Sequence, residues 1–413
     1  MATPSVQERV LIVGAGQAGA RTALALRDAG WQGAIVMAGE EPELPYERPP
    51  LSKAVLTGSA QPGDATVLSE ADCGLHGIEL LRGETVSALD LVHRQARTAR
   101  GARLDYSHLV IATGSRAREL PMAGAQLDGV FVLRTARDAL AVRDRLKHGA
   151  RVVLVGGGFI GLEVAASAAS MGCEVTVVEA HRHLLGRVVT PTIAAAVERL
   201  HRSHGVDVRT GARIDSIEGV DAVRRLRMAD GSAIEADIVI VGIGALANDG
   251  LAIGAGMPCG DGVLVDEGAR TRAEGVYAVG DVARHQTLWG AHGVRLESWE
   301  NAELQATAAA RSIVGKPAEA RGAPWFWTDQ FGGNLQMLGY PDPRHEVVLR
   351  GSLDADSWCA FMVDGERIAA ACLWNAGRER RGIAQLMNAG RPVPASLLAD
   401  RERPLRDLLK VTS

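Results

Sequence analysis

The chain has 413 residues, a formal net charge of −4, and a composition that is 47% hydrophobic and 23% charged. A chain of this length forms two or three domains, each with a hydrophobic core of its own. Its mildly acidic balance gives no reason to expect a nucleic-acid partner.

The cysteines and the apolar runs exclude further kinds of protein. Five cysteines are scattered along the chain without a C-x-x-C pair, so neither a metal site nor a redox dithiol is predicted. Cys73 is expected to lie in a polar loop. The longest apolar run is interrupted by several glycines and by Glu163, which makes it too short for a membrane span. Because an odd number of scattered cysteines fits a reducing compartment, we expect a soluble, cytoplasmic protein with no membrane contact.

The first predicted elements are a strand, a glycine-rich turn and a helix, and the same pattern occurs a second time. Val10–Val13 precedes the first glycine turn (Gly14-Ala15-Gly16-Gln17-Ala18-Gly19), and Val152–Val155 precedes the second glycine turn (Gly156-Gly157-Gly158-Phe159-Ile160-Gly161). In such turns the first glycine permits the tight bend, the second lets the backbone approach a pyrophosphate, and the third lets the helix pack on the strand. The helix N-terminus then stabilises the negative charge of the phosphates.

Each glycine turn has an acidic residue about twenty positions further on, where a carboxylate binds the ribose hydroxyls of a dinucleotide. These residues are Glu40 and Glu179. A single glycine-rich turn also occurs for packing reasons alone. Two turns, each with its acid, predict two dinucleotide sites, and a protein with two such sites usually moves electrons from one to the other.

An internal repeat supports two nucleotide-binding units. Residues 102–114 parallel residues 232–244, each segment reading as a short strand and then a buried strand that ends in glycine. Gly101 and Asp230-Gly231 supply hairpin turns. Between the units, residues 135–148 read as an amphipathic helix.

The last third of the chain changes character. After a polar, glycine-rich stretch, residues 275–281 read as a buried strand ending in Gly280-Asp281, a pattern that also fits a plain helix cap. From Trp325 onward, residues 347–350, 359–363 and 368–373 read as strands, and residues 395–411 read as a helix. We therefore expect a separate C-terminal α+β domain over residues 326–413.

These motifs resemble the flavoprotein ferredoxin reductases of bacterial Rieske-type aromatic-ring dioxygenase and P450 systems, and the resemblance runs nearly end to end. It is most specific in six segments: Arg48–Lys53, Gly156–Glu163, Gly242–Gly244, Val279–Asp281, Glu297–Trp299 and Pro324–Gln330. Residues 242–249 and Trp299 are closer to the dioxygenase branch than to the P450 branch.

The resemblance implies an α/β fold with two Rossmann-like domains, as in glutathione reductase, and a C-terminal α+β domain. The FAD domain would comprise residues 1–115 and 246–325, the NAD domain residues 116–245, and the third domain residues 326–413. Lys53, Glu163 and Trp299 would be the catalytic residues, with Lys53 and Trp299 beside the flavin ring and Glu163 near the nicotinamide. The residues implied to bind FAD are Gly14, Gly16, Ala18, Gly19, Glu40, Arg48, Lys53, Val86, Ala112, Thr113, Gly114, Arg134, Gly280, Asp281, Glu297, Trp299 and Trp327. Those implied to bind NAD are Gly156, Gly158, Phe159, Ile160, Gly161, Glu179 and Gly244.

Taken alone, some of these residues have simpler interpretations. Lys53 reads as a solvated lysine after a Pro-Pro turn, Glu163 as a favourable charge near a helix N-terminus, and an isolated Trp as core.

The implied reaction is reduction of a [2Fe-2S] ferredoxin, Rieske-type ferredoxins included, by NADH through FAD. The ferredoxin would feed an aromatic-ring-hydroxylating dioxygenase or, as an alternative, a P450. A less favoured alternative is an NADH oxidase or disulfide reductase, which needs a redox cysteine where this chain has Ser52. Another is an interaction protein that keeps the fold as a scaffold.

Two finer expectations concern selectivity. Glu179 should favour NADH over NADPH, which would still react with lower efficiency because His181, Arg182 and Arg187 lie nearby. The ferredoxin should dock over the flavin edge, where the domains meet. Arg378-Glu379-Arg380-Arg381 and Arg48 are the candidate contacts, and a solvated charged turn is the alternative for the former.

Overall fold

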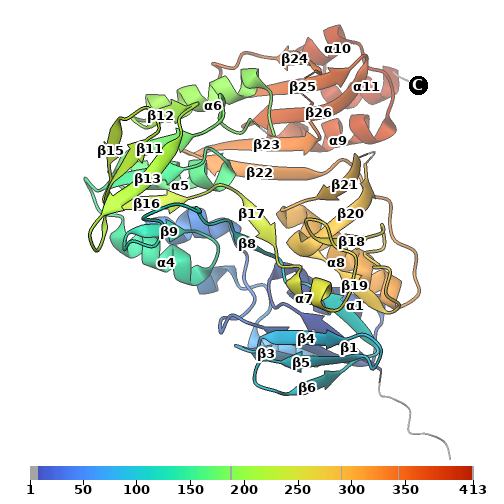
Figure 1. Cartoon of the computed structure of the whole chain (residues 1–413). Helices are drawn as coiled ribbons and strands as arrows, with labels where there is room; N and C mark the ends of the chain where they lie inside the picture. Colours follow the sequence, from blue (N-terminus) through green and yellow to red (C-terminus); the bar gives the residue numbers. More distant parts are fainter. Residues whose placement is uncertain (1–7, 187, 290, 343, 412–413) are drawn as a thin grey trace, which may run out of the picture. The chain divides into compact units, whose positions relative to one another are not determined.

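The computed structural model describes residues 8–186, 188–289, 291–342 and 344–411, which leaves Arg187 outside the described residues. The chain divides into two compact units (Figure 1). Unit 1 comprises residues up to 49, 61–116 and 245–321, and unit 2 comprises residues 50–60, 117–244 and 322–413. The finer division into three domains stays a prediction.

Unit 1 is built on a five-stranded parallel sheet in the order β19-β7-β1-β2-β3. Its strands are β1 (Arg9–Val13), β2 (Ala34–Gly39), β3 (Ile78–Arg82), β7 (His108–Ile111) and β19 (Val276–Ala278). One face packs against α1 (Gln17–Ala29) and α8 (Trp299–Ile313), whose many alanines let both helices lie close to the sheet. Because β2 and β7 lie on opposite sides of β1, the crevice of this sheet opens beside the first glycine turn.

Small elements cover the other face of this sheet. They are a meander of β4 (Val86–Asp90), β5 (Gln95–Thr98) and β6 (Arg103–Asp105), the helix α7 (Gly250–Gly254), and the sheet of β18 (Val263–Val265), β20 (Ala283–Leu288) and β21 (Ala291–Arg295). The connecting strands β8 (Ser115–Ala117) and β17 (Ala245–Ala247) pair with each other. The sequence predicted no element between 245 and 275, because each one there is only a few residues long.

The expectation for Cys73 is wrong. It lies in α3 (Glu70–His76), and its side chain is buried in the core that α1 helps to form. Ser69 and Asp72 form a reciprocal cap that starts this helix, with the Asp72 N–H donating to Ser69 Oγ at 3.1 Å.

Unit 2 contains a second parallel sheet, in the order β12-β11-β10-β16-β9. Its strands are β9 (Val130–Val132), β10 (Arg151–Val155), β11 (Glu174–Glu179), β12 (Asp207–Thr210) and β16 (Ile238–Val241). The accompanying elements are α2 (Ala54–Thr57), α4 (Ala136–Arg145), α5 (Phe159–Ser170), α6 (Pro191–Ser203), β13 (Ile214–Gly219), β14 (Val223–Met228) and β15 (Ala233–Glu235). The helix expected over 135–148 is α4, with Thr135 as its cap.

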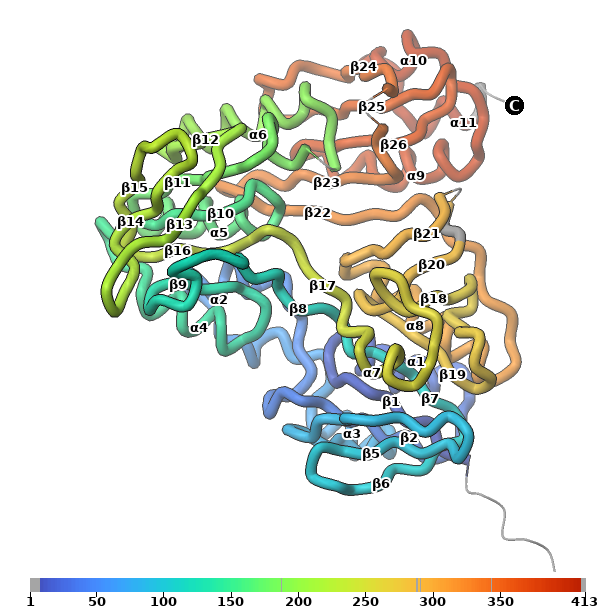
Figure 2. The backbone as a smooth tube through the Cα atoms, in the orientation of Figure 1, coloured from blue at the N-terminus to red at the C-terminus, as the bar shows by residue number. Residues whose placement is uncertain are grey.

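The C-terminal part of unit 2 is an antiparallel sheet in the order β22-β23-β26-β25-β24. Its elements are β22 (Trp325–Gln330), β23 (Gly333–Gly339), β24 (Glu346–Arg350), β25 (Trp358–Asp364), β26 (Arg367–Trp374), α9 (Arg380–Ala389), α10 (Ala395–Ala399) and α11 (Leu405–Val411). The helical character expected for residues 395–411 is confirmed in α10 and α11, but Asp400–Pro404 separates the two helices because proline cannot continue a helix. Strand β22 lies beside α5 in both views (Figures 1 and 2).

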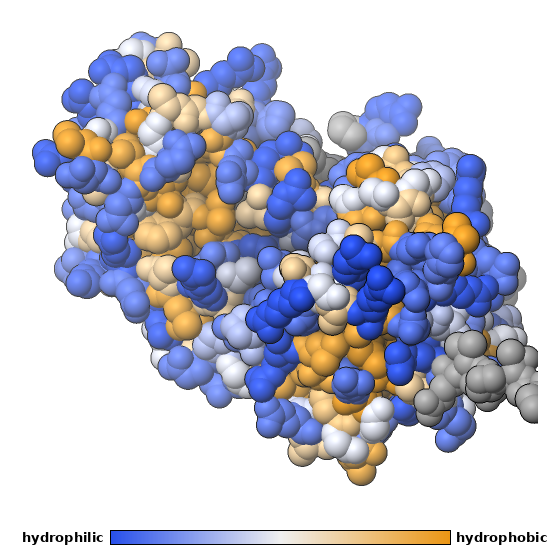
Figure 3. All heavy atoms as spheres, turned by 60° about the horizontal axis from the view of Figure 1, so that its bottom comes forward, coloured by the Kyte–Doolittle hydropathy of each residue, from blue (hydrophilic) through white to orange (hydrophobic). Residues whose placement is uncertain are grey.

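On the face drawn in Figure 3, apolar residues gather in several areas, with hydrophilic residues between and around them. The exposed large hydrophobic side chains of the described residues are Leu75, Val92, Ile160, Val220, Ile253 and Leu304. Within the described part of the chain, no helix has both the length and the apolar character needed to cross a membrane.

Candidate cofactor and active site

The first glycine turn connects β1 to α1 and leaves no room for side chains at two positions. Gly14 has a φ of +113°, and a Cβ there would lie 2.2 Å from the carbonyl oxygen of Ala112. A Cβ on Gly19 would lie 2.0 Å from the carbonyl oxygen of Gly14. At Gly16, in contrast, no described atom comes within 4 Å of that position, so the backbone is open to a ligand. Helix α1 has no side-chain cap from the described residues, which leaves its first N–H groups for an anion.

The Gly280-Asp281 turn lies against this first turn. Gly280 has a φ of +75°, and a Cβ on it would lie 2.8 Å from the Cβ of Ala18. The Asp281 carboxylate accepts a hydrogen bond from Ser115 Oγ at 2.9 Å. An open glycine backbone beside a carboxylate fits a pyrophosphate and the hydroxyl groups of a dinucleotide, because phosphate needs N–H donors and hydroxyls need an acceptor. The residues of unit 1 therefore fit FAD.

Several other residues implied to bind FAD lie near the ends of the same strands. A Cβ on Gly39 would lie 2.4 Å from the Cβ of Ala15, so the exposed Glu40 follows β2 directly beside the first glycine turn. Ala112, Thr113 and Gly114 follow β7, and Thr113 Oγ1 donates to the Asn248 carbonyl oxygen at 2.8 Å.

The remaining residues implied to bind FAD lie away from the first glycine turn in the sequence, four of them in unit 1 and three in unit 2. Arg48 pairs with Glu41 at 2.8 Å, and Glu297 pairs with Arg295. Val86 begins β4, and Trp299 begins α8. Lys53, Arg134 and Trp327 belong to unit 2.

The second glycine turn, in unit 2, repeats the geometry of the first. Gly156 has a φ of +109°, and a Cβ there would lie 2.4 Å from the carbonyl oxygen of Gly242. Glu179, at the end of β11, accepts hydrogen bonds from the backbone N–H groups of Gly157 and His181, both at 2.7 Å. The acid is therefore fixed over the turn, in the position from which it can bind a ribose, and these residues fit NAD.

The other residues implied to bind NAD surround this turn. Gly158 caps α5, and a Cβ on Gly161 would lie 2.3 Å from the carbonyl oxygen of Gly156. Phe159 packs edge-on against Phe326 with ring centroids 4.9 Å apart, and Ile160 is 44% exposed. Gly244 follows β16 with a φ of +108°.

A buried polar cluster surrounds Glu163 on α5. Its Oε2 lies 2.8 Å from the Nζ of Lys53 and accepts a 2.5 Å hydrogen bond from Ser52 Oγ. Its Oε1 accepts hydrogen bonds from Thr328 Oγ1 at 2.7 Å and from the Asp329 N–H at 3.4 Å. Glu163 is only 6% exposed, so the ion pair and these donors offset the cost of burying its charge. The interpretation of Lys53 as a freely solvated lysine is wrong.

The cluster continues through side chains to which the sequence analysis gave no role. Gln330 Nε2 donates to Thr328 Oγ1 at 3.1 Å, and Gln330 Oε1 contacts His201 Nε2 at 2.8 Å. Burial lowers the pKa of His201 to about 4, so this ring is neutral. Its Nε2–H donates a hydrogen bond to the amide oxygen of Gln330. Thr328 and Gln330 belong to a segment that carried the family resemblance, whereas His201 had no signal.

An aromatic stack lies on β22 in the same unit. The rings of Trp325 and Trp327 are stacked with centroids 5.0 Å apart, and the Arg380 guanidinium lies 4.3 Å from the centroid of Trp325. Arg378 and Arg381 are exposed. Of the predicted charged patch, Arg380 is thus half-buried and engaged with a tryptophan, while Arg378 and Arg381 face solvent.

Neither thiol nor metal chemistry has a suitable group among the described residues. All five cysteines are free. Burial raises the pKa of Cys73, Cys173 and Cys259, and raises the pKa of Cys359 and Cys372 to about 12. These thiols are therefore poor nucleophiles. No group of three metal-ligating side chains occurs in the described ranges.

Comparison with known proteins places this geometry in a family. Residues 8–306 match the model described as pyridine nucleotide-disulphide oxidoreductase, and residues 325–409 match the model described as reductase C-terminal. Putidaredoxin reductase of Pseudomonas putida is 36% identical over 411 residues, which are 98% of this chain and 97% of that protein. The ferredoxin–NAD(+) reductase subunit of the benzene 1,2-dioxygenase system of Pseudomonas putida is 40% identical over 404 residues, 97% of each chain.

A solved structure gives the same result. In the crystal structure of the covalent putidaredoxin reductase–putidaredoxin complex, one chain superposes with a TM-score of 0.95 and 36% identity, covering 98% of this chain and 99% of that one. The descriptions of the family and of the relatives imply FAD and NAD(H) as cofactors.

Proposed function

The chain belongs to the pyridine nucleotide-disulphide oxidoreductase family, and we propose that it is an NADH-dependent ferredoxin reductase that feeds an aromatic-ring-hydroxylating dioxygenase. The observation that carries this proposal is the pair of glycine turns, each closed by backbone contacts and each accompanied by a carboxylate. FAD would supply the chemistry that links the two-electron oxidation of NADH to the one-electron reduction of an iron–sulfur protein. The names of relatives in the benzene, anthranilate and chlorobenzene dioxygenase systems support this role.

The residues of unit 1 would hold FAD. The backbone at Gly14–Gly19 and the start of α1 would bind the pyrophosphate, and Glu40 and Asp281 would accept hydrogen bonds from hydroxyl groups. Arg48, Val86, Ala112–Gly114, Glu297 and Trp299 would complete the site from unit 1. The family resemblance also implies Lys53, Arg134 and Trp327, which belong to unit 2.

NADH would bind at the second glycine turn. Because Glu179 is fixed by two backbone N–H groups, its charge would remain beside the ribose, where it accepts a hydrogen bond from the 2′-hydroxyl and repels a 2′-phosphate. We therefore expect a preference for NADH, with NADPH used less efficiently.

The Lys53–Glu163 pair would act at the flavin ring. Glu163 fixes the position of the Lys53 ammonium, and Ser52 and Thr328 in turn fix Glu163. A cation held in this way can stabilise negative charge that develops nearby during reduction, without reorganisation of solvent. The buried thiols with raised pKa values argue against the disulfide-reductase alternative.

The exposed Arg378 and Arg381 would guide an acidic ferredoxin to the C-terminal sheet, whereas Arg380 supports the tryptophan stack. An NADH-consuming reaction and five free thiols also agree with a cytoplasmic location.

Rapid mixing of the purified protein with NADH, and then with candidate ferredoxins, tests the function. We expect a yellow protein with one FAD per chain, bleaching of the flavin by NADH, and reoxidation by a [2Fe-2S] ferredoxin. A folded protein that takes up no FAD would overturn the assignment. Slow turnover with long-lived reduced flavin would favour the scaffold alternative, and faster reoxidation by a P450-type ferredoxin would favour the P450 branch.

A further inference from the structure

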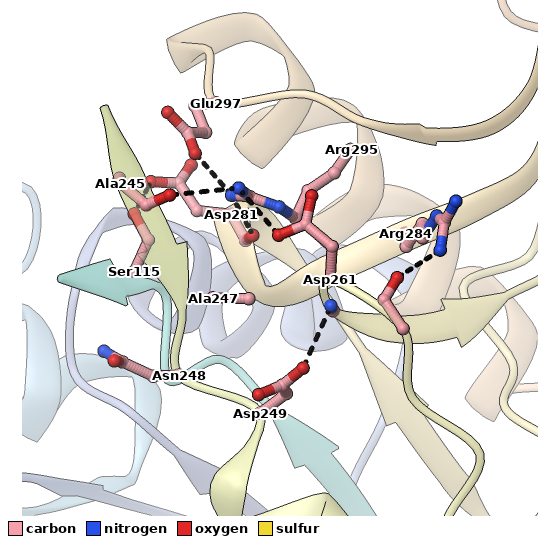
Figure 4. A network of polar contacts seen from close by, with 12 residues as sticks. Ser115, Ala245, Ala247, Asn248, Asp249, Asp261, Asp281, Arg284, Arg295 and Glu297 are labelled. Carbon is pink, nitrogen blue, oxygen red and sulfur yellow. Dashed lines mark hydrogen bonds and ion pairs between the residues drawn. The ribbon is translucent and has the colours of Figure 1, made fainter. Parts of the chain in front are cut away.

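We propose that Arg295, Gln305 and Ser115 form a clamp that presets the Gly280-Asp281 turn for binding FAD, with Arg295 as its main positioning residue. The inference rests on the proposed FAD site. It assigns a purpose to a polar network in unit 1 that the glycine turns alone do not require (Figure 4).

Arg295 holds the carboxyl side of the turn. Its side chain, at the end of β21, is only 10% exposed and pairs with Asp261 at 3.2 Å and with Glu297. Its Nη1 also donates to the carbonyl oxygen of Asp281 at 3.3 Å, and its Nη2 to that of Ala245 at 3.5 Å. Figure 4 shows the guanidinium between these groups. A planar cation with several fixed donors can bridge acceptors on different segments, which a lysine ammonium cannot do with the same geometry.

Gln305 holds the amino side of the turn. This residue of α8 is fully buried, and its Oε1 accepts a 2.6 Å hydrogen bond from the Gly280 N–H. The orientation of the amide is fixed by Asn301, which donates to the same oxygen at 3.2 Å, and by His285, whose Nε2 lies 2.8 Å from Gln305 Nε2. Since the Gln305 amide nitrogen is the donor here, His285 Nε2 acts as an acceptor.

Ser115 holds the side chain of Asp281, while Arg295 and Gln305 hold the backbone on either side of it. It donates to Asp281 Oδ2 at 2.9 Å and is itself buried. The turn at Gly280–Val282 spans only three residues and begins at a glycine with a φ of +75°, so local structure alone constrains it weakly. With the Gly280 N–H, the Asp281 carbonyl and the Asp281 carboxylate all held, the carboxylate is in place before FAD arrives. The cost of ordering it is then not subtracted from the binding free energy.

Titration of the deflavoprotein with FAD tests the clamp. Quenching of flavin fluorescence gives the Kd, and the visible circular dichroism of bound flavin reports its surroundings. We expect Arg295→Lys to raise the Kd of FAD about tenfold, the factor that corresponds to about 1.4 kcal/mol. Ser115→Ala, which removes one neutral donor and is the milder change, should raise it about threefold. Both variants should alter the dichroism of the bound flavin.

Arg284→Lys is the matched control. Arg284 lies in the same small sheet and also donates to backbone carbonyls, those of Gly260 and of Gly293, the latter at 2.9 Å. It should lower the Tm of the deflavoprotein as Arg295→Lys does but leave the Kd of FAD unchanged. If Arg295→Lys and Ser115→Ala bind FAD with the Kd and dichroism of the parent protein, the clamp is refuted while the FAD site stands. A parent protein that binds no FAD would overturn the proposed function and the clamp with it.

Discussion

Acid should destabilise unit 2 through His201, and replacing this histidine should remove much of that sensitivity. His201 is fully buried, and burial lowers its pKa from 6.5 to about 4. Its Nε2 contacts Gln330, and the electrostatic effect of His204 lowers the pKa of His201 further. The pKa of His201 is lower in the folded protein than in the unfolded chain. The stability that comes from burying the neutral ring is therefore fully present above pH 6.5 and is lost as the pH falls toward 4.

The size of the effect follows from these two values. Between pH 7 and pH 5, His201 becomes protonated in the unfolded chain but stays neutral in the folded protein. At roughly 1.4 kcal/mol per pH unit, this lowers the free energy of unfolding by about 2 kcal/mol. For a folding unit of about 150–250 residues, this corresponds to a fall in Tm of roughly 4–8 °C.

Thermal unfolding at a series of pH values, for the parent protein and His201→Gln, measures this contribution. The variant keeps a donor for Gln330 but does not titrate, so its Tm should fall less steeply below pH 6.5. His93→Gln, a change at an exposed histidine, is the control and should follow the parent protein. Parallel curves for the parent and His201→Gln would refute the reasoning. His285, with a pKa also lowered to about 4 by burial and by Arg321, should add a similar loss in unit 1.

Three further predictions concern the reaction. Glu179→Gln should reduce the ratio of kcat/KM for NADH to that for NADPH about tenfold, because an amide no longer repels a 2′-phosphate; an unchanged ratio in steady-state assays would contradict the role of Glu179. Lys53→Met should slow flavin reduction by NADH about tenfold or more in stopped-flow traces, and it should cost about 3–5 kcal/mol of stability because Glu163 is left buried and unpaired. Adding Glu163→Gln to Lys53→Met should restore the stability but not the rate of flavin reduction. Recovery of both would show that the Lys53–Glu163 pair has a purely structural role. Arg378→Glu with Arg381→Glu should lower ferredoxin reduction and its salt dependence while NADH–ferricyanide turnover stays intact; if both activities fall together, the patch is structural.

The sequence predicted the parallel units well because their signals are local. Val10–Val13 and Val152–Val155 are apolar runs that end in glycine, and the structure makes both of them central strands. The glycine turns follow as expected, because only glycine fits a φ above +100° against a carbonyl oxygen. Cys73 was misplaced because a seven-residue helix with few apolar residues has too little periodicity to recognise.

The clusters around Glu163 and Asp281 could not be predicted in the same way. Ser52 and Thr328 reach Glu163 from 111 and 165 positions away along the chain, and Ser115 reaches Asp281 from 166. Such contacts depend on which strands and helices become neighbours, and periodicity carries no information about that. The family resemblance pointed to Lys53 and Glu163 separately, but the donors that hold them together became visible only in the folded chain.

The hydrogen bond between Thr328 and Glu163 bears on how freely parts of this protein can be recombined. Glu163 lies in the segment matched by one family model and Thr328 in the segment matched by the other. The C-terminal module thus supplies a hydrogen bond to the Lys53–Glu163 pair, both residues of which lie in the preceding module. A chimera that receives a foreign C-terminal module would keep this pair satisfied only if the donor module carries a hydroxyl at position 328 and an amide at position 330. The two modules therefore constrain each other's sequence. C-terminal modules can be exchanged only between relatives that share the hydroxyl at position 328 and the amide at position 330.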